Sequence, residues 1–257
     1  MKISKTGAAR SQHRNKQMTD TSSGYQQVPS VGLSSSVCVM EDYLRRSFKA
    51  TDDELNYLKR VIDLRSKRRQ PLTSKQTDYS YPSVVIDDFL YHGNLGHASN
   101  IGLLNQLGIR HIVNVCDCRL DKTIVEKYNV LWINLYDELQ ADIKKYFDAT
   151  NEFLYNCKRK NEKVLVHCQM GISRSSTIVL AYLMKYHHDS LFKAYDYLLE
   201  RRRMATPNMS FFLQLIRYEK ELRAIKEIDE TKNNDDKQNP IQNIDPAIEN
   251  SHGQMQQ

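Results

Sequence analysis

The chain has 257 residues, a net charge of +6 and an apolar fraction of 40%. This length suits one domain of ordinary size with tails. The positive charge is too small and too dispersed for a typical nucleic-acid-binding protein, and it is compatible with an acidic or phosphorylated partner. Five cysteines in a chain without a secretion signal predict reduced thiols and a place in the cytoplasm, or in the cytoplasm and nucleus.

Polar segments at both ends predict tails around one domain. Residues 1–38 are rich in Ser, Thr and Gln, and residues 229–257 are rich in Asn and Gln, so both are expected to be disordered. Residues 39–81 are predicted to form a helical extension and a linker. Thr51 and Glu54 have the spacing of a capping box. One helical face after them carries Leu55, Leu58, Ile62 and Arg65.

Strand and helix patterns alternate from Ser83 onward. The segment "SVVIDDFLYHGN" predicts two strands with a turn at Asp87 and Asp88, and "ASNIGLLNQLG" predicts a helix that ends at Gly108. Buried strands are expected in "RHIVNVC", "VLWINL" and "KVLVHC", with a helix in "DIKKYFDATNEFLYNCK". Three final helices are expected, at Ser173–Tyr186, Ser190–Arg202 and Met209–Ile228.

This alternation predicts an α/β fold with a mostly parallel central sheet flanked by helices. Ligands of such sheets bind beyond the carboxyl ends of the strands, and Cys168 stands at that end of "KVLVHC". The longest apolar run, "IVLAYLM", is too short to cross a bilayer, so no membrane span is expected.

The loop "HCQMGISRS" has the composition of an anion-binding site. Gly171 permits a tight curl in which backbone N–H groups point inward at the start of a helix. The planar guanidinium of Arg174 can offer two parallel hydrogen bonds to a phosphate. The phosphate-binding residues predicted in this way are Gln169, Met170, Gly171, Ile172, Ser173 and Arg174.

The same loop suits a reactive thiolate at Cys168. Inward N–H groups and a helix N-terminus favour the thiolate form of a cysteine. Ser175 can donate its hydroxyl to the sulfur, and His167 is expected to brace the loop by hydrogen bonding to the backbone. The alternative is a buried structural cysteine, but a core thiol needs neither Gly171 nor Arg174.

The pattern of His-Cys, five residues, Arg and Ser resembles the signature of the cysteine-dependent dual-specificity protein phosphatases. "FLYHGNLGHASNIGLLNQLGIRHIVNV" and "AYDYLLERRRMATPNMSFFLQLIRYEKEL" are similar to the two ends of that family's catalytic domain, particularly in its slingshot-like and atypical branches. The resemblance covers about residues 82–224. It implies the cysteine-based protein phosphatase fold and hydrolysis of phosphotyrosine, phosphoserine and phosphothreonine in proteins. The reaction would pass through a cysteinyl-phosphate, with no metal and no cofactor.

The resemblance also implies an aspartate that protonates the leaving group, on a loop about thirty residues before the cysteine. Asp137 stands 31 positions before Cys168 and follows the strand "VLWINL", so we expect it to be this acid. Asp142 immediately precedes a predicted helix and is better explained as an N-cap. Glu138 is a weaker rival.

Three further readings follow from the residues around these motifs. Uncharged residues in the loop disfavour the lipid phosphatases of this superfamily, which place lysines there. Cys116 and Cys118 lack the further ligands that a zinc site needs, so no metal is expected there. The side chains of Arg201, Arg202 and Arg203 are expected to be solvated at the end of a helix. The remaining functional alternative is a phosphoprotein-binding module with negligible turnover.

Overall fold

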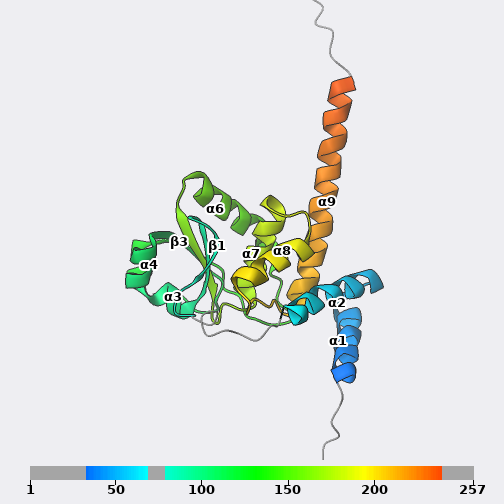
Figure 1. Ribbon diagram of the computed structural model, residues 1–257, viewed down its shortest axis with the longest axis horizontal. Coiled ribbons are helices and arrows are strands. Elements are labelled where there is room, and N and C mark those ends of the chain that lie inside the picture. The colour runs from blue at the N-terminus through cyan, green and yellow to red at the C-terminus, as the bar shows by residue number, and fades with distance from the viewer. Residues whose placement is uncertain (1–32, 69–78, 239–257) are drawn as a thin grey trace, which may run out of the picture. The chain divides into compact units, whose positions relative to one another are not determined.

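The computed structural model describes residues 33–68 and 79–238 (Figure 1). The chain divides into two units, residues 1–40 and residues 41–257, and the fold described below belongs to the second. In the described part of the chain, no helix is both long enough and apolar enough to cross a membrane.

A five-stranded sheet lies at the centre of the domain, in the order β1-β2-β5-β3-β4. Its strands are β1 (Ser83–Ile86), β2 (Leu90–Asn94), β3 (Ile109–Asn114), β4 (Asn129–Trp132) and β5 (Lys163–Cys168). Only the β1–β2 pair is antiparallel; the other three pairs are parallel. The central strand β5 has fully buried residues from Val164 to Val166 because helices cover both of its faces. The sequence-based fold class is therefore confirmed.

Helices pack on both faces of the sheet (Figure 1). The helices are α1 (Leu33–Phe48), α2 (Asp52–Lys67), α3 (Leu95–Ser99), α4 (Ile101–Leu107), α5 (Lys122–Lys127), α6 (Phe147–Arg159), α7 (Arg174–Tyr186), α8 (Leu191–Arg201) and α9 (Met209–Gln238). On one face α6 and α7 contact β5 while α8 contacts β1, and on the other face α3 and α4 contact the sheet. Helix α7 is buried along nearly its whole length, so its N-terminus is held firmly at the carboxyl end of β5.

The structure confirms most predicted elements and adds two features. The turn at Asp87 and Asp88 joins β1 and β2, and Gly108 ends α4 with a φ of 71°. The helix predicted before Gly108 is in fact two helices, because the Asn100 side chain caps a new N-terminus by accepting from Leu103 N–H at 3.0 Å. Helix α5 was not predicted, since its six residues are too few to show a clear period.

The first and last helices of the described chain extend into the segments whose composition predicted tails. Residues 33–38 belong to α1, and residues 229–238 continue α9. A helix that is anchored by buried residues in one part of its length can extend beyond them, because adding a residue to an existing helix costs less than starting a new one. In α9 the anchoring residues include Phe211, Leu215 and Tyr218, which are buried. Residues 1–32 and 239–257 lie outside the described part of the chain.

Helix α2 begins with the capping box that the sequence predicted. Glu54 N–H donates to Thr51 Oγ1 at 3.3 Å, and Thr51 N–H donates to Glu54 Oε2 at 3.0 Å. The face that packs on the domain carries Leu55, Leu58 and Val61, whereas Ile62 is only half-buried. The predicted face was therefore shifted by one residue at its far end.

Glu54 also joins α2 to α9 by a buried ion pair. Its carboxylate is 3.1 Å from Arg217 Nε and 3.4 Å from Lys220 Nζ, while the Glu54 side chain is only 6% exposed. Burial raises the pKa of Glu54, but the hydrogen bonds from Arg217 and Thr51 outweigh it, so the net pKa lies below its usual value of 4.5.

We expect Glu54→Ala to lower the free energy of unfolding by about 2 to 3 kcal/mol at neutral pH, since it removes a cap and one partner of a buried charged hydrogen bond. A lowered pKa in the folded state means that this stabilisation is present above pH 4.5 and is lost as the pH falls through the lowered value. Urea unfolding at pH 7 and pH 3 measures both effects. Asp53→Ala, an exposed acid in the same turn, is the matched control, and an equal loss in both variants would contradict the assignment.

Candidate active site

Cys168 is the last residue of β5, and α7 begins six residues later. The loop between them curls back tightly at Gly171, which has a φ of 65°. A Cβ atom at this position would lie 2.3 Å from the carbonyl oxygen of Gly93 on the neighbouring strand β2. Only glycine fits here, both for its backbone angles and for the close approach of β2.

The carbonyl groups of this loop are held from outside. Gln169, Gly171 and Ile172 carbonyl oxygens accept, respectively, from Leu95 N–H at 3.2 Å, Arg202 Nε at 2.8 Å and Thr206 N–H at 2.7 Å. In a planar trans peptide, the C=O of one residue and the N–H of the next point in opposite directions. The N–H groups of Met170, Ile172 and Ser173 are therefore turned toward the inside of the loop, where they form a nest for an anion.

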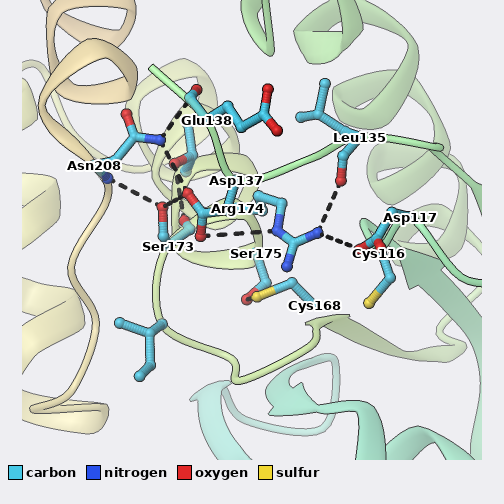
Figure 2. Close-up of polar contacts among 12 residues, drawn as sticks. Cys116, Asp117, Leu135, Asp137, Glu138, Cys168, Ser173, Arg174, Ser175 and Asn208 are labelled. Atoms are coloured by element: carbon cyan, nitrogen blue, oxygen red, sulfur yellow. Dashed lines mark hydrogen bonds and ion pairs between the residues drawn. The ribbon is translucent and has the colours of Figure 1, made fainter. Parts of the chain in front are cut away.

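Arg174 begins α7 and is buried, with 6% of its surface exposed. Its Nη1 donates to Asp117 Oδ1 at 3.0 Å and to the Leu135 carbonyl at 2.8 Å, which locks the guanidinium in place (Figure 2). The hydrogen bond from Arg174 lowers the pKa of Asp117. Arg174 Nε is buried and has no hydrogen-bond partner among the described residues. Because Asp117 and the Leu135 carbonyl hold Nη1, the edge of the guanidinium that carries Nε is available to bind a ligand.

Asp117 and the Leu135 carbonyl were missed by the sequence reasoning. Asp117 follows β3, which is parallel to β5 and next to it. An acidic residue just after such a strand could have been recognised in the sequence as a candidate site residue, because ligands bind at this edge of the sheet. Nothing in the sequence marks the carbonyl of Leu135 as a ligand of Arg174.

Ser175 lies beside the sulfur of Cys168. Its Oγ donates to Cys168 Sγ at 3.2 Å, and both residues are buried. A hydroxyl donor at this distance stabilises negative charge on the sulfur.

Asp137 is brought to the same site by the loop that follows β4. Its Oδ1 accepts from Ser173 Oγ at 2.8 Å and from Asn208 Nδ2 at 2.9 Å, and its Oδ2 is 3.8 Å from Arg174 Nε (Figure 2). Asn208 also donates its backbone N–H to Ser173 Oγ at 3.0 Å. The carboxylate is therefore held by one oxygen, while the other faces the unpaired edge of Arg174. Asn208 was not predicted, because it lies in the turn after Pro207, far along the chain.

The two rival acids lie elsewhere. Figure 2 shows the Glu138 carboxylate pointing away from Cys168. Asp142 Oδ1 accepts from Lys145 N–H at 3.4 Å in the short 3-10 turn at Lys144–Tyr146. Helix α6 begins only at Phe147, so the prediction that Asp142 is its N-cap was wrong. The structure thus brings only Asp137, among these three acids, to the cysteine loop.

His167 is fully buried in β5 and makes little contact with the loop backbone. Its Nδ1 is 3.4 Å from the Cys168 carbonyl, longer than an ordinary hydrogen bond, and 3.9 Å from Cys116 Sγ. Burial lowers the pKa of His167 to about 4, so the ring is neutral at physiological pH. The predicted bracing through the backbone therefore amounts to one weak contact.

Arg202 corrects a sequence-based expectation. It was expected to be solvated at the end of a helix, yet it is 1% exposed and packs behind the loop. Besides its bond to the Gly171 carbonyl, it donates from Nη1 to Ser83 Oγ at 3.2 Å. Burial lowers the pKa of Arg202 to about 10, which still leaves it charged near neutrality. A buried cation thus supports the loop through the Gly171 carbonyl.

Other residues of the loop contribute backbone rather than side chains. Met170 is 61% exposed, and Gln169 Oε1 accepts only a weak contact from Cys118 Sγ at 3.8 Å. Within the described ranges no group of three or more His, Cys, Asp or Glu side chains is arranged to hold a metal ion.

Comparison with known proteins points to one family. The profile of the dual specificity phosphatase catalytic domain matches residues 90–221, just over half of the chain. The chain is 40% identical over 142 residues to a probable rhodanese domain-containing dual specificity protein phosphatase of Dictyostelium discoideum, covering 55% of this chain and 30% of that protein. It is 38% identical over 142 residues to human protein phosphatase Slingshot homolog 2, covering 55% of this chain and 10% of that protein. The chain thus spans about a third or less of the length of these curated relatives.

Solved structures agree with the sequence relatives. A mouse putative dual specificity phosphatase complexed with zinc tungstate superposes with a TM-score of 0.54 and 27% identity. The match covers 61% of this chain and 97% of that one.

Proposed function

The chain belongs to the dual specificity phosphatase family, and from this premise we propose that it removes phosphate from tyrosine and from serine or threonine side chains of proteins. The observation that carries the proposal is the convergence of three groups on one loop. Cys168 begins the loop of inward N–H groups, Arg174 follows the loop with an Nε that makes no hydrogen bond, and Asp137 Oδ2 lies 3.8 Å from that Nε (Figure 2). These positions support the roles that we propose for them in phosphoryl transfer: Cys168 as nucleophile, Arg174 as anion holder and Asp137 as proton donor.

In the first step, Cys168 Sγ attacks phosphorus, and the bond from phosphorus to the substrate oxygen breaks. Asp137 gives its proton to that oxygen, which leaves as a phenol or an alcohol. Arg174 and the N–H groups of residues 170, 172 and 173 bind the three equatorial oxygens, over which the negative charge of the transferring phosphoryl group is spread.

In the second step, water attacks the phosphorus of the cysteinyl-phosphate. Asp137, now a carboxylate, accepts a proton from the water, and the electron pair of the phosphorus–sulfur bond returns to Cys168 Sγ. Ser175 donates to the sulfur as it regains its charge, at the 3.2 Å distance of the resting site. Inorganic phosphate then leaves.

Phosphorylated proteins are the partners that this chemistry requires, and we place the protein in the cytoplasm or nucleus as a signalling phosphatase. Cys116, Cys118, Cys157 and Cys168 are free thiols, which supports a reducing compartment. The tetrahedral tungstate in the mouse relative is an anion of phosphate shape, which supports oxyanion binding in proteins of this fold.

Turnover of p-nitrophenyl phosphate and of a peptide carrying both phosphotyrosine and phosphothreonine, in excess chelator, tests the proposal. We expect hydrolysis at both residues, and a phosphorylated Cys168 peptide when the reaction is denatured rapidly and examined by mass spectrometry. If the wild-type chain binds the peptide intact and releases no phosphate, it is a phosphoprotein-binding module instead.

A further inference from the structure

His92, a buried histidine outside the cysteine loop, contacts Ser175, whose hydroxyl donates to Cys168 Sγ. His92 lies on β2, the parallel neighbour of β5, and is 0% exposed. Its Nε2 is 2.9 Å from Ser175 Oγ, which in turn is 3.2 Å from Cys168 Sγ. The three side chains form a continuous chain of hydrogen bonds that ends on the reactive sulfur.

Ser175 differs from its neighbours in the direction of its hydroxyl. Three consecutive hydroxyl residues open α7, and the second and third donate to the carbonyl four residues earlier: Ser176 to Ile172 at 2.6 Å and Thr177 to Ser173 at 2.9 Å. This is the usual partner of a serine or threonine inside a helix. Ser175 alone turns away from its helix, toward Cys168.

The hydrogen bonds decide which nitrogen of His92 carries the proton. Ser175 commits its proton to Cys168, and Ser176 commits its proton to the Ile172 carbonyl. Both serine oxygens near His92 Nε2, at 2.9 Å and 3.5 Å, are therefore available only as acceptors. Nε2 must be the donor, and Nδ1, which has no partner in the described structure, is the bare nitrogen.

His92 stays neutral in this position. Burial, together with the positive charge of Arg202, lowers the pKa of His92 well below its usual value of 6.5. The ring therefore neither gains nor loses a proton in the working range of pH. It acts by orientation, holding the Ser175 oxygen so that the hydroxyl proton points at the sulfur.

We infer that His92 is a positioning residue for the breakdown of the cysteinyl-phosphate. This inference rests on the proposed function. When water cleaves the phosphorus–sulfur bond, the bonding electron pair goes to Cys168 Sγ and a proton of the water goes to Asp137. The Ser175 hydroxyl, held by His92 Nε2–H, stabilises the charge that appears on the sulfur. Without His92, Ser175 is free to rotate toward other acceptors, and the sulfur becomes a poorer leaving group.

The test uses the full chain and four variants: His92→Leu, His92→Gln, Ser175→Ala and the double variant His92→Leu with Ser175→Ala. Glutamine keeps an N–H near the position of Nε2, whereas leucine keeps only bulk. Loss of one oriented hydrogen bond is expected to slow breakdown about tenfold. When breakdown limits turnover, kcat and KM fall by the same factor while kcat/KM holds, and stopped-flow traces with p-nitrophenyl phosphate show a burst.

We expect His92→Leu to show this burst, with kcat and KM lowered by the same factor. We expect His92→Gln to retain most of the wild-type kcat. The double variant should be no slower than Ser175→Ala, because His92 acts only through Ser175. The inference is overturned if His92→Leu keeps the wild-type kcat and KM. It is equally overturned if the two losses multiply in the double variant, or if His92→Gln is as slow as His92→Leu at an unchanged melting temperature.

His111→Leu is the matched control. His111 is a buried histidine of the neighbouring strand β3, but its Nε2 is 2.7 Å from Glu162, at the end of the sheet opposite Cys168. This variant should keep the wild-type kcat and KM. A second measurement does not depend on turnover: the rate of iodoacetamide alkylation of Cys168, followed by mass spectrometry, should fall in His92→Leu near neutral pH and be restored in His92→Gln. A wild-type chain without turnover would refute the proposed function, while this alkylation would still decide the role of His92.

Discussion

Cys168→Ser is expected to abolish hydrolysis, with a fall in kcat of at least about 10³-fold. A serine hydroxyl at the end of β5 is not ionised near neutrality, so the inward N–H groups have no anionic nucleophile to present to phosphorus. Arg174 and the loop carbonyl contacts do not involve the sulfur, and the variant should still bind phosphate. Hydrolysis of p-nitrophenyl phosphate and fluorescence anisotropy of a labelled phosphopeptide measure the two properties separately.

Cys157→Ser provides the control for loss of a buried thiol. Cys157 is buried in α6, and it should keep its activity when changed because α6 takes no part in the site. Measurable turnover by Cys168→Ser, above the level of a heat-denatured sample, would mean that another group attacks the phosphorus. Binding without turnover in both the wild-type chain and Cys168→Ser would favour the phosphoprotein-binding module.

Asp137→Asn is expected to slow hydrolysis of phosphoserine and phosphotyrosine peptides by about 10² to 10⁴. Asparagine keeps an oxygen for the hydrogen bonds from Ser173 and Asn208, so the loop should hold its position, but it has no acidic proton to give. The loss should shrink for aryl phosphates with acidic leaving groups such as p-nitrophenol, because such groups depart without protonation. A plot of log kcat/KM against leaving-group pKa should therefore be steeper for the variant than for the wild type.

Glu138→Gln separates general acid catalysis from a simple loss of charge. Glu138 is the adjacent residue of the same loop, and its carboxylate points away from Cys168 (Figure 2). We expect this variant to keep the wild-type slope and nearly the wild-type rate. If Glu138→Gln becomes sensitive to the leaving group while Asp137→Asn does not, the acid has been assigned to the wrong residue.

The local parts of the site follow from the sequence because they lie close together along the chain. Cys168, Gly171, Arg174 and Ser175 fall within one loop and the first turn of one helix, so the backbone between them keeps them close to one another. Asp137 was predictable in a weaker way, from its place after a strand and from its spacing to Cys168. The strands were recognisable for a similar reason, since a continuous apolar run such as Val164 to Val166 specifies a strand buried on both faces.

Element boundaries were less predictable. The strands β3 and β4 are shorter than the apolar runs that predicted them: they end at Asn114 and Trp132, inside those runs. The chain leaves the sheet at these residues to form the loops that carry Asp117 and Asp137. A hydrophobic pattern indicates which residues are buried, not where a strand ends. Residues after the end of a strand are also buried when their loop packs over the core.

By itself the sequence determined the α/β class and the residue pattern of the loop from Cys168 to Ser175, both of which depend on short patterns, while Asp137 was singled out through the resemblance to a family. Tertiary structure alone decided which distant residues hold those groups: Asp117 lies 57 residues from Arg174, Asn208 lies 71 from Asp137, and His92 lies 83 from Ser175. Such residues have no pattern of their own, and the burial of Arg202 even opposes the usual exposure of arginine. A buried polar residue is tolerated only where a specific partner meets it, and folding, not local sequence, brings the partner there.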